Sequence, residues 1–228
     1  MNLNANLIPR MLDFSEYSDA GFNMTEAITY IDAGRMVTGL KAGIQRLFQR
    51  REYIDRLNVF PVPDRDTGTN MAFSFKVVHD AVSSAEGLSI KQLMKKIARS
   101  SLDGSRGNSG AIMAQYFHGF SESLGDESQL DAKGLADASS GGAVAAWTAM
   151  SEPVAGTLPT VLEDFSKGLQ QKVRLGCTDI QELLKYGLEC ARDSLERTPE
   201  LLPVLKQSGV VDAGGQGFVD LLEGCLLY

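Results

Sequence analysis

The sequence is poor in the residues on which much enzyme chemistry depends. It contains three cysteines, two histidines and one tryptophan among 228 residues. The cysteines form no C-x-x-C pair, which argues against a structural zinc site and indicates buried thiols in a reducing compartment. His79 and His118 are too few for most histidine-based metal sites and catalytic triads, and we expect neither to be catalytic.

Positive charge and long apolar runs are also scarce. The chain has 22 lysines and arginines against 29 acidic residues, a formal net charge of −7. Such a chain has no basic surplus to attract a phosphate backbone, so we expect no nucleic-acid partner. No apolar run approaches the roughly 18 residues of a membrane span, and the N-terminus lacks a signal-peptide pattern. We therefore expect a cytoplasmic protein without integral membrane association.

Apolar residues recur at helical spacing along most of the chain. Met36, Leu40, Ile44 and Leu47, for example, form one stripe on a helix. No segment shows the strict alternation typical of a strand, which predicts an all-α fold. The pattern predicts core helices over residues 25–51, 70–85, 89–102, 108–124, 131–150, 157–173, 178–197 and 214–227, with a short turn of helix near 199–206.

Three places carry sequence signals for the start of a helix. Two have the capping-box pattern, and the third has an N-cap residue followed by a first-turn proline. They are Ser89 with Gln92, Thr178 with Gln181, and Thr198 with Pro199. We interpret residues 1–24 as an N-terminal arm and 25–228 as one domain. The apolar ending at Leu226–Tyr228 suggests further C-terminal domains in a longer protein.

Two carboxylates one residue apart precede the second predicted helix. The segment Asn58–Asn70 reads N-V-F-P-V-P-D-R-D-T-G-T-N. Asp64 and Asp66 could converge on one hard cation, since Mg²⁺ typically takes one or two carboxylates plus phosphate oxygens. The same residues are also typical of a simple turn and helix N-cap, so this segment alone leaves both interpretations open.

Glycine-rich segments precede three later helices. Leu102–Gly110 could turn successive backbone N–H groups toward an anion, although it lacks the Gly-Lys-Ser/Thr ending of a P-loop. Gly209–Gly217, which contains Asp212, suits close approach to a flat ligand such as a base or ribose. Each could equally be a tight connection between packed helices. Pro153–Thr157 is a weaker candidate of the same kind.

Together, these segments resemble the motifs of the DhaL-like ATP-binding domain. This domain is shared by the nucleotide-binding subunit of dihydroxyacetone kinase and the N-terminal domain of bacterial fatty acid kinases. Asn58–Met71 differs at one position from N-V-F-P-V-P-D-G-D-T-G-T-N-M, and Gly209–Gly217 matches G-V-V-D-A-G-G-Q-G throughout. Gly104–Gly110 corresponds to G-A-R-G-N-S-G, and Glu152–Val161 is an eroded form of K-P-V-E-G-T-I-L-T-V. The motifs are closest to the fatty acid kinase branch.

The resemblance implies an up-and-down barrel of eight helices, with the nucleotide in the loops at one end. It implies that Asp64 and Asp66 bind Mg²⁺, with Asn58 as a weaker third ligand. It also implies that Asp64, Asp66 and Thr69 are catalytic. The residues implied to bind ATP or ADP are Thr67, Asn70, Gly107, Asn108, Ser109, Gly110, Thr157, Asp212, Gly214 and Gly215.

The function implied is transfer of the γ-phosphoryl group of ATP to a fatty acid carboxylate. A DegV-like lipid-binding protein or fused domain would present the acid, and a homodimer is a further partner we consider. Two alternatives stay open: a dihydroxyacetone (glycerone) kinase-like domain, and a regulatory nucleotide-binding module without turnover. The last follows from Arg65, which replaces the family's glycine. If that position needs a positive φ, a side chain there costs about 1–2 kcal/mol, and its charge would repel a bound cation.

Overall fold

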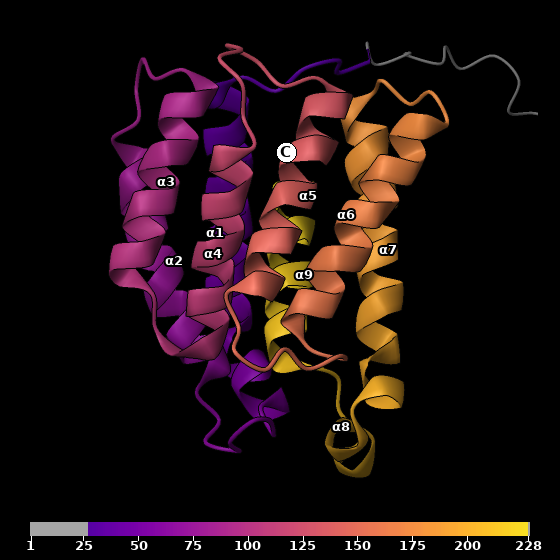
Figure 1. Ribbon diagram of the computed structural model, residues 1–228. Helices are drawn as coiled ribbons and strands as arrows, with labels where there is room; N and C mark the ends of the chain where they lie inside the picture. Colours follow the sequence, from indigo (N-terminus) through magenta and orange to yellow (C-terminus); the bar gives the residue numbers. More distant parts are fainter. Residues whose placement is uncertain (1–26, 228) are drawn as a thin grey trace, which may run out of the picture.

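The computed structural model describes residues 27–227, and these residues form helices without a named strand (Figure 1). The predicted arm at residues 1–24 lies outside the described residues. None of the described helices is long and apolar enough to cross a membrane. The helices are α1 (Ala33–Leu57), α2 (Thr67–Ser83), α3 (Ile90–Gly104), α4 (Gly107–Glu122), α5 (Ala132–Thr148), α6 (Leu158–Arg174), α7 (Ile180–Leu201), α8 (Pro203–Ser208) and α9 (Ala213–Cys225).

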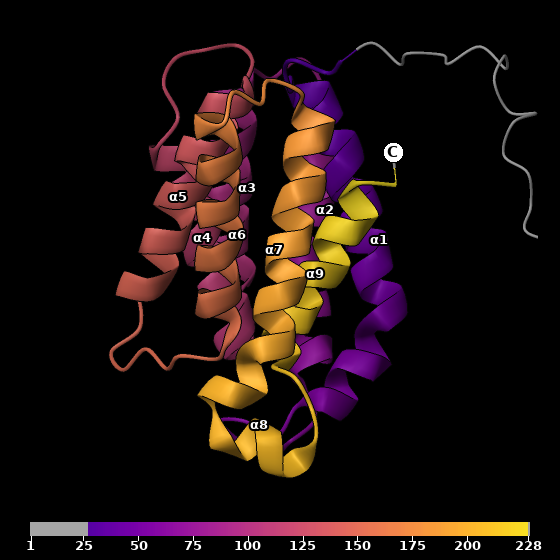
Figure 2. The same cartoon turned by 90° about the vertical axis from the view of Figure 1, so that its right-hand side faces the viewer.

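Eight of the helices in residues 27–227 form a closed ring with up-and-down topology (Figures 1 and 2). Each helix from α1 to α6 packs against the next, and α9 packs against both α7 and α1. The short α8 lies outside this ring, at the lower end in both views. The predicted all-α barrel of eight helices is therefore confirmed.

The ring closes where α1 meets α9, through two glycines. A methyl group at Gly43 would lie 2.5 Å from the Leu221 carbonyl oxygen, and one at Gly224 would lie 2.6 Å from the Gly43 Cα. The absence of side chains thus lets the two backbones touch. Beside this contact, the buried Asp220 of α9 pairs with Arg50 of α1 at 3.3 Å.

The barrel interior is filled by apolar side chains from every helix of the ring. Aromatic rings from four helices meet edge to face across it, which links opposite walls of the barrel. The Phe75 and Phe117 ring centroids are 5.9 Å apart, and those of Phe165 and Phe218 are 5.4 Å apart. Tyr116 bridges the two pairs by contacting Phe117 and Phe218.

Three predicted helix boundaries were wrong. The first helix runs over 33–57, not 25–51, because the Asp32 side chain accepts the Arg35 N–H and fixes the start there. The predicted capping box at Thr178 and Gln181 is also displaced by one residue. The N-cap of α7 is Asp179, whose carboxylate accepts the Gln181 N–H at 2.8 Å. The capping box at Ser89 is confirmed.

Pro199 lies inside α7 and does not begin a new helix. A proline has no N–H for the carbonyl four residues earlier, which here belongs to Leu195. The Thr198 hydroxyl donates to that carbonyl at 2.7 Å and so replaces the lost bond. The helix therefore continues to Leu201, and the short α8 begins at Pro203.

Candidate functional site

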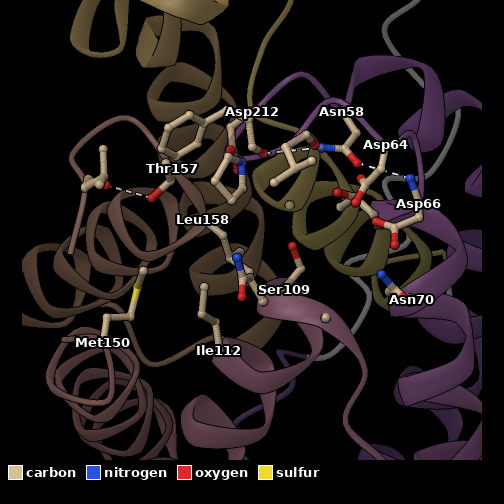
Figure 3. Close-up of a pocket in the computed structure, with 18 of the residues that line it drawn as sticks. Asn58, Asp64, Asp66, Asn70, Ser109, Ile112, Met150, Thr157, Leu158 and Asp212 are labelled. Carbon is tan, nitrogen blue, oxygen red and sulfur yellow. Dashed lines mark hydrogen bonds between the residues drawn. The ribbon is translucent and has the colours of Figure 1, made fainter. Parts of the chain in front are cut away.

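A cavity of about 470 Å³ lies at the end of the barrel where α2, α4, α6 and α9 begin (Figure 3). The loops that precede these four helices form its walls. Most residues that the sequence predicted for the site line this cavity, although they come from four separate segments. They are Asn58, Asp64, Asp66, Thr67, Asn70, Gly107, Asn108, Ser109, Thr157, Asp212 and Gly214.

Three predicted residues lie behind the cavity wall. Thr69 is tied to Asp55 of α1 through both its backbone and its hydroxyl. A methyl group at Gly110 would meet the Ser74 hydroxyl of α2, so this glycine permits α2 and α4 to pack closely. The Gly215 N–H donates to the Asp212 carboxylate at 2.7 Å. All three thus support residues that do face the cavity.

The buried amide of Asn58 organises the loop that carries the two aspartates. Its Nδ2 donates to the Val62 carbonyl at 3.1 Å and to the Phe60 carbonyl at 3.3 Å. Its Oδ1 accepts the Asp66 N–H at 3.1 Å. The same side chain therefore fixes the loop at three points and places Asp64 and Asp66 at the edge of the cavity (Figure 3).

Neither carboxylate in this loop is used by the protein itself. Asp66 is the N-cap residue of α2, yet its side chain makes no capping hydrogen bond, and Asp64 is exposed. Both therefore keep free lone pairs for a hard cation. Within residues 27–227 no group of three potential ligands from Asp, Glu, His and Cys forms a metal site. Two carboxylates fit Mg²⁺ only if other oxygens, such as those of phosphate or water, complete its shell.

Asp55 explains why the Asp66 carboxylate stays free, although no sequence motif pointed to this residue. The Asp55 carboxylate accepts the Thr69 backbone N–H at 2.9 Å and the Thr69 hydroxyl at 2.8 Å. Thr69 is the third residue of α2, whose N–H is the usual target of an N-cap side chain. Asp55 thus caps α2 from a different helix. No local sequence pattern connects residues fourteen apart, and α1 was predicted to end before Asp55.

Helix capping differs sharply between the two ends of the barrel. At the far end, α1, α3, α5 and α7 all begin with a side chain that accepts a backbone N–H. At the cavity, α2, α4 and α6 begin without one. Free N–H groups at a helix N-terminus attract anions, and the helix dipole adds to this attraction. Three such termini around one cavity favour an anionic ligand with several oxygens.

Gly107 allows the start of α4 to approach α2. Its φ is +61°, and a methyl group there would lie 2.7 Å from the Asn70 side-chain nitrogen. The Ser109 hydroxyl stands on the next part of this turn and points into the cavity (Figure 3). The turn therefore offers backbone N–H groups and a hydroxyl on one wall.

Asp212 is the buried acid of the cavity. Its carboxylate accepts the Gly215 N–H and caps α9, while burial raises its pKa to about 6. Its own N–H donates to the Thr198 hydroxyl at 3.1 Å. Thr198, which the sequence suggested only as a helix start, therefore holds Asp212 in place.

The cavity has one acidic side and one apolar side. Four carboxyl groups line it (Asp64, Asp66, Glu152 and Asp212), and its described lining includes no lysine, arginine or histidine. In Figure 3, Ile112, Leu158 and Met150 lie across the cavity from Asp64 and Asp66. A polyanion could therefore bind only with cations on the acidic side, while the apolar side suits a flat organic group.

Arg65 adopts the left-handed backbone conformation that the sequence raised as a condition. Its φ is +59°, the only positive value for a non-glycine residue in the described part of the chain. Its side chain is exposed and does not line the cavity, although Asp64 and Asp66 on either side of it do. The backbone strain is thus real, whereas the charge points away from the cavity floor.

These loops and helices match the DAK2 domain over residues 61–227. The chain belongs to the DAK2 domain family. It is 40% identical over 184 residues to an uncharacterized protein of Staphylococcus aureus, covering 81% of this chain and 33% of that protein. It is 41% identical over 199 residues to one of Staphylococcus saprophyticus, covering 87% of this chain and 36% of that protein. The chain thus spans about a third of the length of these relatives.

The DAK2 fold is also seen in solved structures. The dihydroxyacetone kinase from C. freundii in complex with AMP-PNP and Mg²⁺ superposes with a TM-score of 0.63 at 17% identity. The match covers 97% of this chain and 38% of the kinase. Its native form gives a TM-score of 0.60 at 16% identity. At this identity the likeness establishes the shared fold of the helical barrel.

Proposed function

We propose that this DAK2 domain binds Mg²⁺–ATP and transfers the γ-phosphoryl group to a fatty acid carboxylate, which a DegV-like lipid-binding partner or fused domain presents. One observation carries the nucleotide part of the proposal. The cavity combines two free carboxylates, three helix N-termini without side-chain caps and an apolar wall. This combination suits a metal-bound polyphosphate joined to a base.

The residues of the chain would divide the ligand between them. Asp64 and Asp66 would hold Mg²⁺, which when bound offsets the negative charge of the phosphates. The N–H groups that open α4 and the Ser109 hydroxyl would receive phosphate oxygens. Leu158 and Ile112 would contact the base or ribose on the apolar side. Positioning and charge neutralisation are the main contributions a protein makes to phosphoryl transfer.

The transfer step needs no base when the acceptor is a carboxylate. A carboxylate oxygen forms a bond to the γ-phosphorus, and the bond from that phosphorus to the β–γ bridging oxygen breaks. The products are an acyl phosphate and ADP, and no proton moves. The absence of histidine and lysine from the described cavity lining is consistent with this acceptor class. The sequence motifs, which match the fatty acid kinase branch, favour it further.

The second candidate acceptor is dihydroxyacetone. A triose hydroxyl must lose a proton during transfer, and a nearby carboxylate such as Asp212 would have to accept it. The kinase from C. freundii shares the fold and acts on dihydroxyacetone by its name. This acceptor is therefore the necessary comparison in any assay.

Calorimetric titration of ATP with and without Mg²⁺ tests the nucleotide site. We expect binding only with Mg²⁺, and we expect Asp64→Asn and Asp66→Asn each to weaken it at least tenfold. Asp103→Asn, which alters an exposed acid outside the cavity, is the matched control. Binding of ATP that ignores Mg²⁺ would contradict the proposal.

A transfer assay then separates the acceptors. The protein, Mg²⁺–ATP and a lipid-binding protein loaded with a fatty acid should yield acyl phosphate, whereas dihydroxyacetone should yield no phosphorylated product. Phosphorylation of the triose alone would assign the domain to the second candidate. Mg²⁺–ATP binding without transfer to either acceptor would identify a regulatory module.

A further inference from the structure

Arg65 has a costly conformation and an exposed charge with no described role in the fold. A non-glycine residue at φ +59° is strained, and glycine would avoid this strain. No hydrogen bond or ion pair of the Arg65 side chain is present within residues 27–227. Strained residues that the fold itself does not need are commonly found at functional sites.

The position of Arg65 relates it to whatever enters the cavity. It lies between the two carboxylates of the cavity edge, on a loop that Asn58 fixes at three points. Its own side chain faces solvent at that edge. An incoming molecule that approaches Asp64 and Asp66 from solvent therefore passes the Arg65 guanidinium.

An anionic acceptor would need such a cation. The cavity is lined by four carboxyl groups and, in its described lining, by no basic side chain. A bound polyphosphate would add further negative charge. A guanidinium can hold a carboxylate through two parallel hydrogen bonds, which both attracts and orients it.

We propose that Arg65 binds the carboxylate of the phosphoryl acceptor at the cavity mouth. The inference rests on the proposed function and adds a specificity-determining residue to it: Arg65 selects anionic acceptors over neutral ones. It also explains why a strained arginine stands where a glycine would fit. The residue acts on the acceptor and leaves the nucleotide to Asp64 and Asp66.

Three variants test this role: Arg65→Gly, Arg65→Gln and Arg65→Lys, with the exposed Arg99→Ala as the control. Arg65→Gly and Arg65→Gln should raise the KM for the acid-loaded carrier about tenfold or more. Both should leave the affinity for Mg²⁺–ATP no weaker. Arg65→Lys, which keeps the charge but loses the paired hydrogen bonds, should give an intermediate KM.

Thermal melting and carrier binding distinguish acceptor recognition by Arg65 from damage to the fold and from docking of the carrier protein. Arg65→Gly should raise the melting temperature by about 2–4 °C while acceptor KM worsens, a combination that damage to the fold would not produce. Binding of the carrier without its fatty acid should be unchanged. Equal loss for loaded and empty carrier would overturn the proposal in favour of protein docking, as would an unchanged acceptor KM. Failure of wild-type protein to bind Mg²⁺–ATP would instead refute the proposed function.

Discussion

The Asp55 carboxylate of α1 accepts both hydrogen-bond donors of Thr69, at 2.9 Å from the backbone nitrogen and 2.8 Å from the hydroxyl oxygen. This pair joins the first two helices and caps α2 from outside. It leaves the residue in the ordinary N-cap position, Asp66, with an unused carboxylate. A structural bond thus keeps a candidate metal ligand available.

Asp55→Ala should therefore affect both stability and ligand binding. Loss of the two hydrogen bonds should lower the free energy of unfolding by about 1–2 kcal/mol. The Asp66 carboxylate can then turn to the vacated Thr69 N–H, so Mg²⁺-dependent ATP affinity should fall. Urea denaturation and calorimetry measure the two effects. Glu52→Ala, an exposed acid on the same helix, should change unfolding by less than about 0.5 kcal/mol. Unchanged ATP affinity in Asp55→Ala would argue against this role.

Gly107 and Gly87 allow backbone conformation to be separated from crowding at the site. Both have positive φ, +61° and +75°, but a methyl group at Gly87 would meet nothing within 4 Å. Gly87→Ala should lower stability by about 1 kcal/mol and leave ATP binding intact. Gly107→Ala should lower stability further and weaken ATP binding at least tenfold, because Asn70 must move. Equal calorimetric affinities for the two variants would show that this turn does not contact the ligand.

Asp212 should make stability depend on pH. Burial raises its folded pKa to about 6, above its ordinary value, so the native state binds the proton more tightly than the unfolded chain does. Its contribution is full below about pH 4 and is lost as pH rises through about 6, a difference of roughly 3 kcal/mol. Asp212→Asn keeps an oxygen for the Gly215 N–H and removes this dependence.

Chemical denaturation at pH 4.5 and 7.5 checks the effect. The stability of Asp212→Asn relative to the wild type should increase between these two values. Asp131→Asn, which alters the cap of α5 at the opposite end of the barrel, serves as the control for a general loss of carboxylate capping. A constant difference between Asp212→Asn and wild type would rule out the raised pKa.

Thr198→Val should be more harmful than its small change in shape suggests. The hydroxyl donates to the Leu195 carbonyl and accepts the Asp212 N–H, and Thr198 is fully buried. Valine would leave both backbone groups without a partner, at a cost of about 2–4 kcal/mol. ATP affinity should fall with it, since Asp212 loses its anchor. The control is Thr148→Val, an exposed threonine near the end of α5. Denaturation midpoints that fall equally in both variants would contradict the argument.

The sequence predicted the barrel well because apolar spacing along each helix reports directly which face is buried. It also predicted most of the cavity residues, since their motifs are contiguous in the chain. What it could not provide were contacts across the fold. Asp55 and Thr69 belong to different helices, and Pro199 stays helical only because the Thr198 hydroxyl replaces its missing N–H.

Arg65 shows a different limit. The sequence raised both its conformational cost and its charge as obstacles to a metal site. The structure confirms the positive φ but gives the side chain an exposed position outside the cavity lining. The direction of a side chain depends on the backbone angles of its loop, which the residue identities alone did not determine.

The uneven capping of the barrel gives the ligand a second role. One end of the molecule is completed by its own side chains, whereas the other end has helix termini that only a bound anion would satisfy. A ligand at 100 times its dissociation constant adds about 2.7 kcal/mol to the stability of the state it binds. Amide hydrogen exchange and protease cleavage at the loop end should therefore slow as nucleotide rises. In a cell, the lifetime of this domain would then follow the supply of its own substrate.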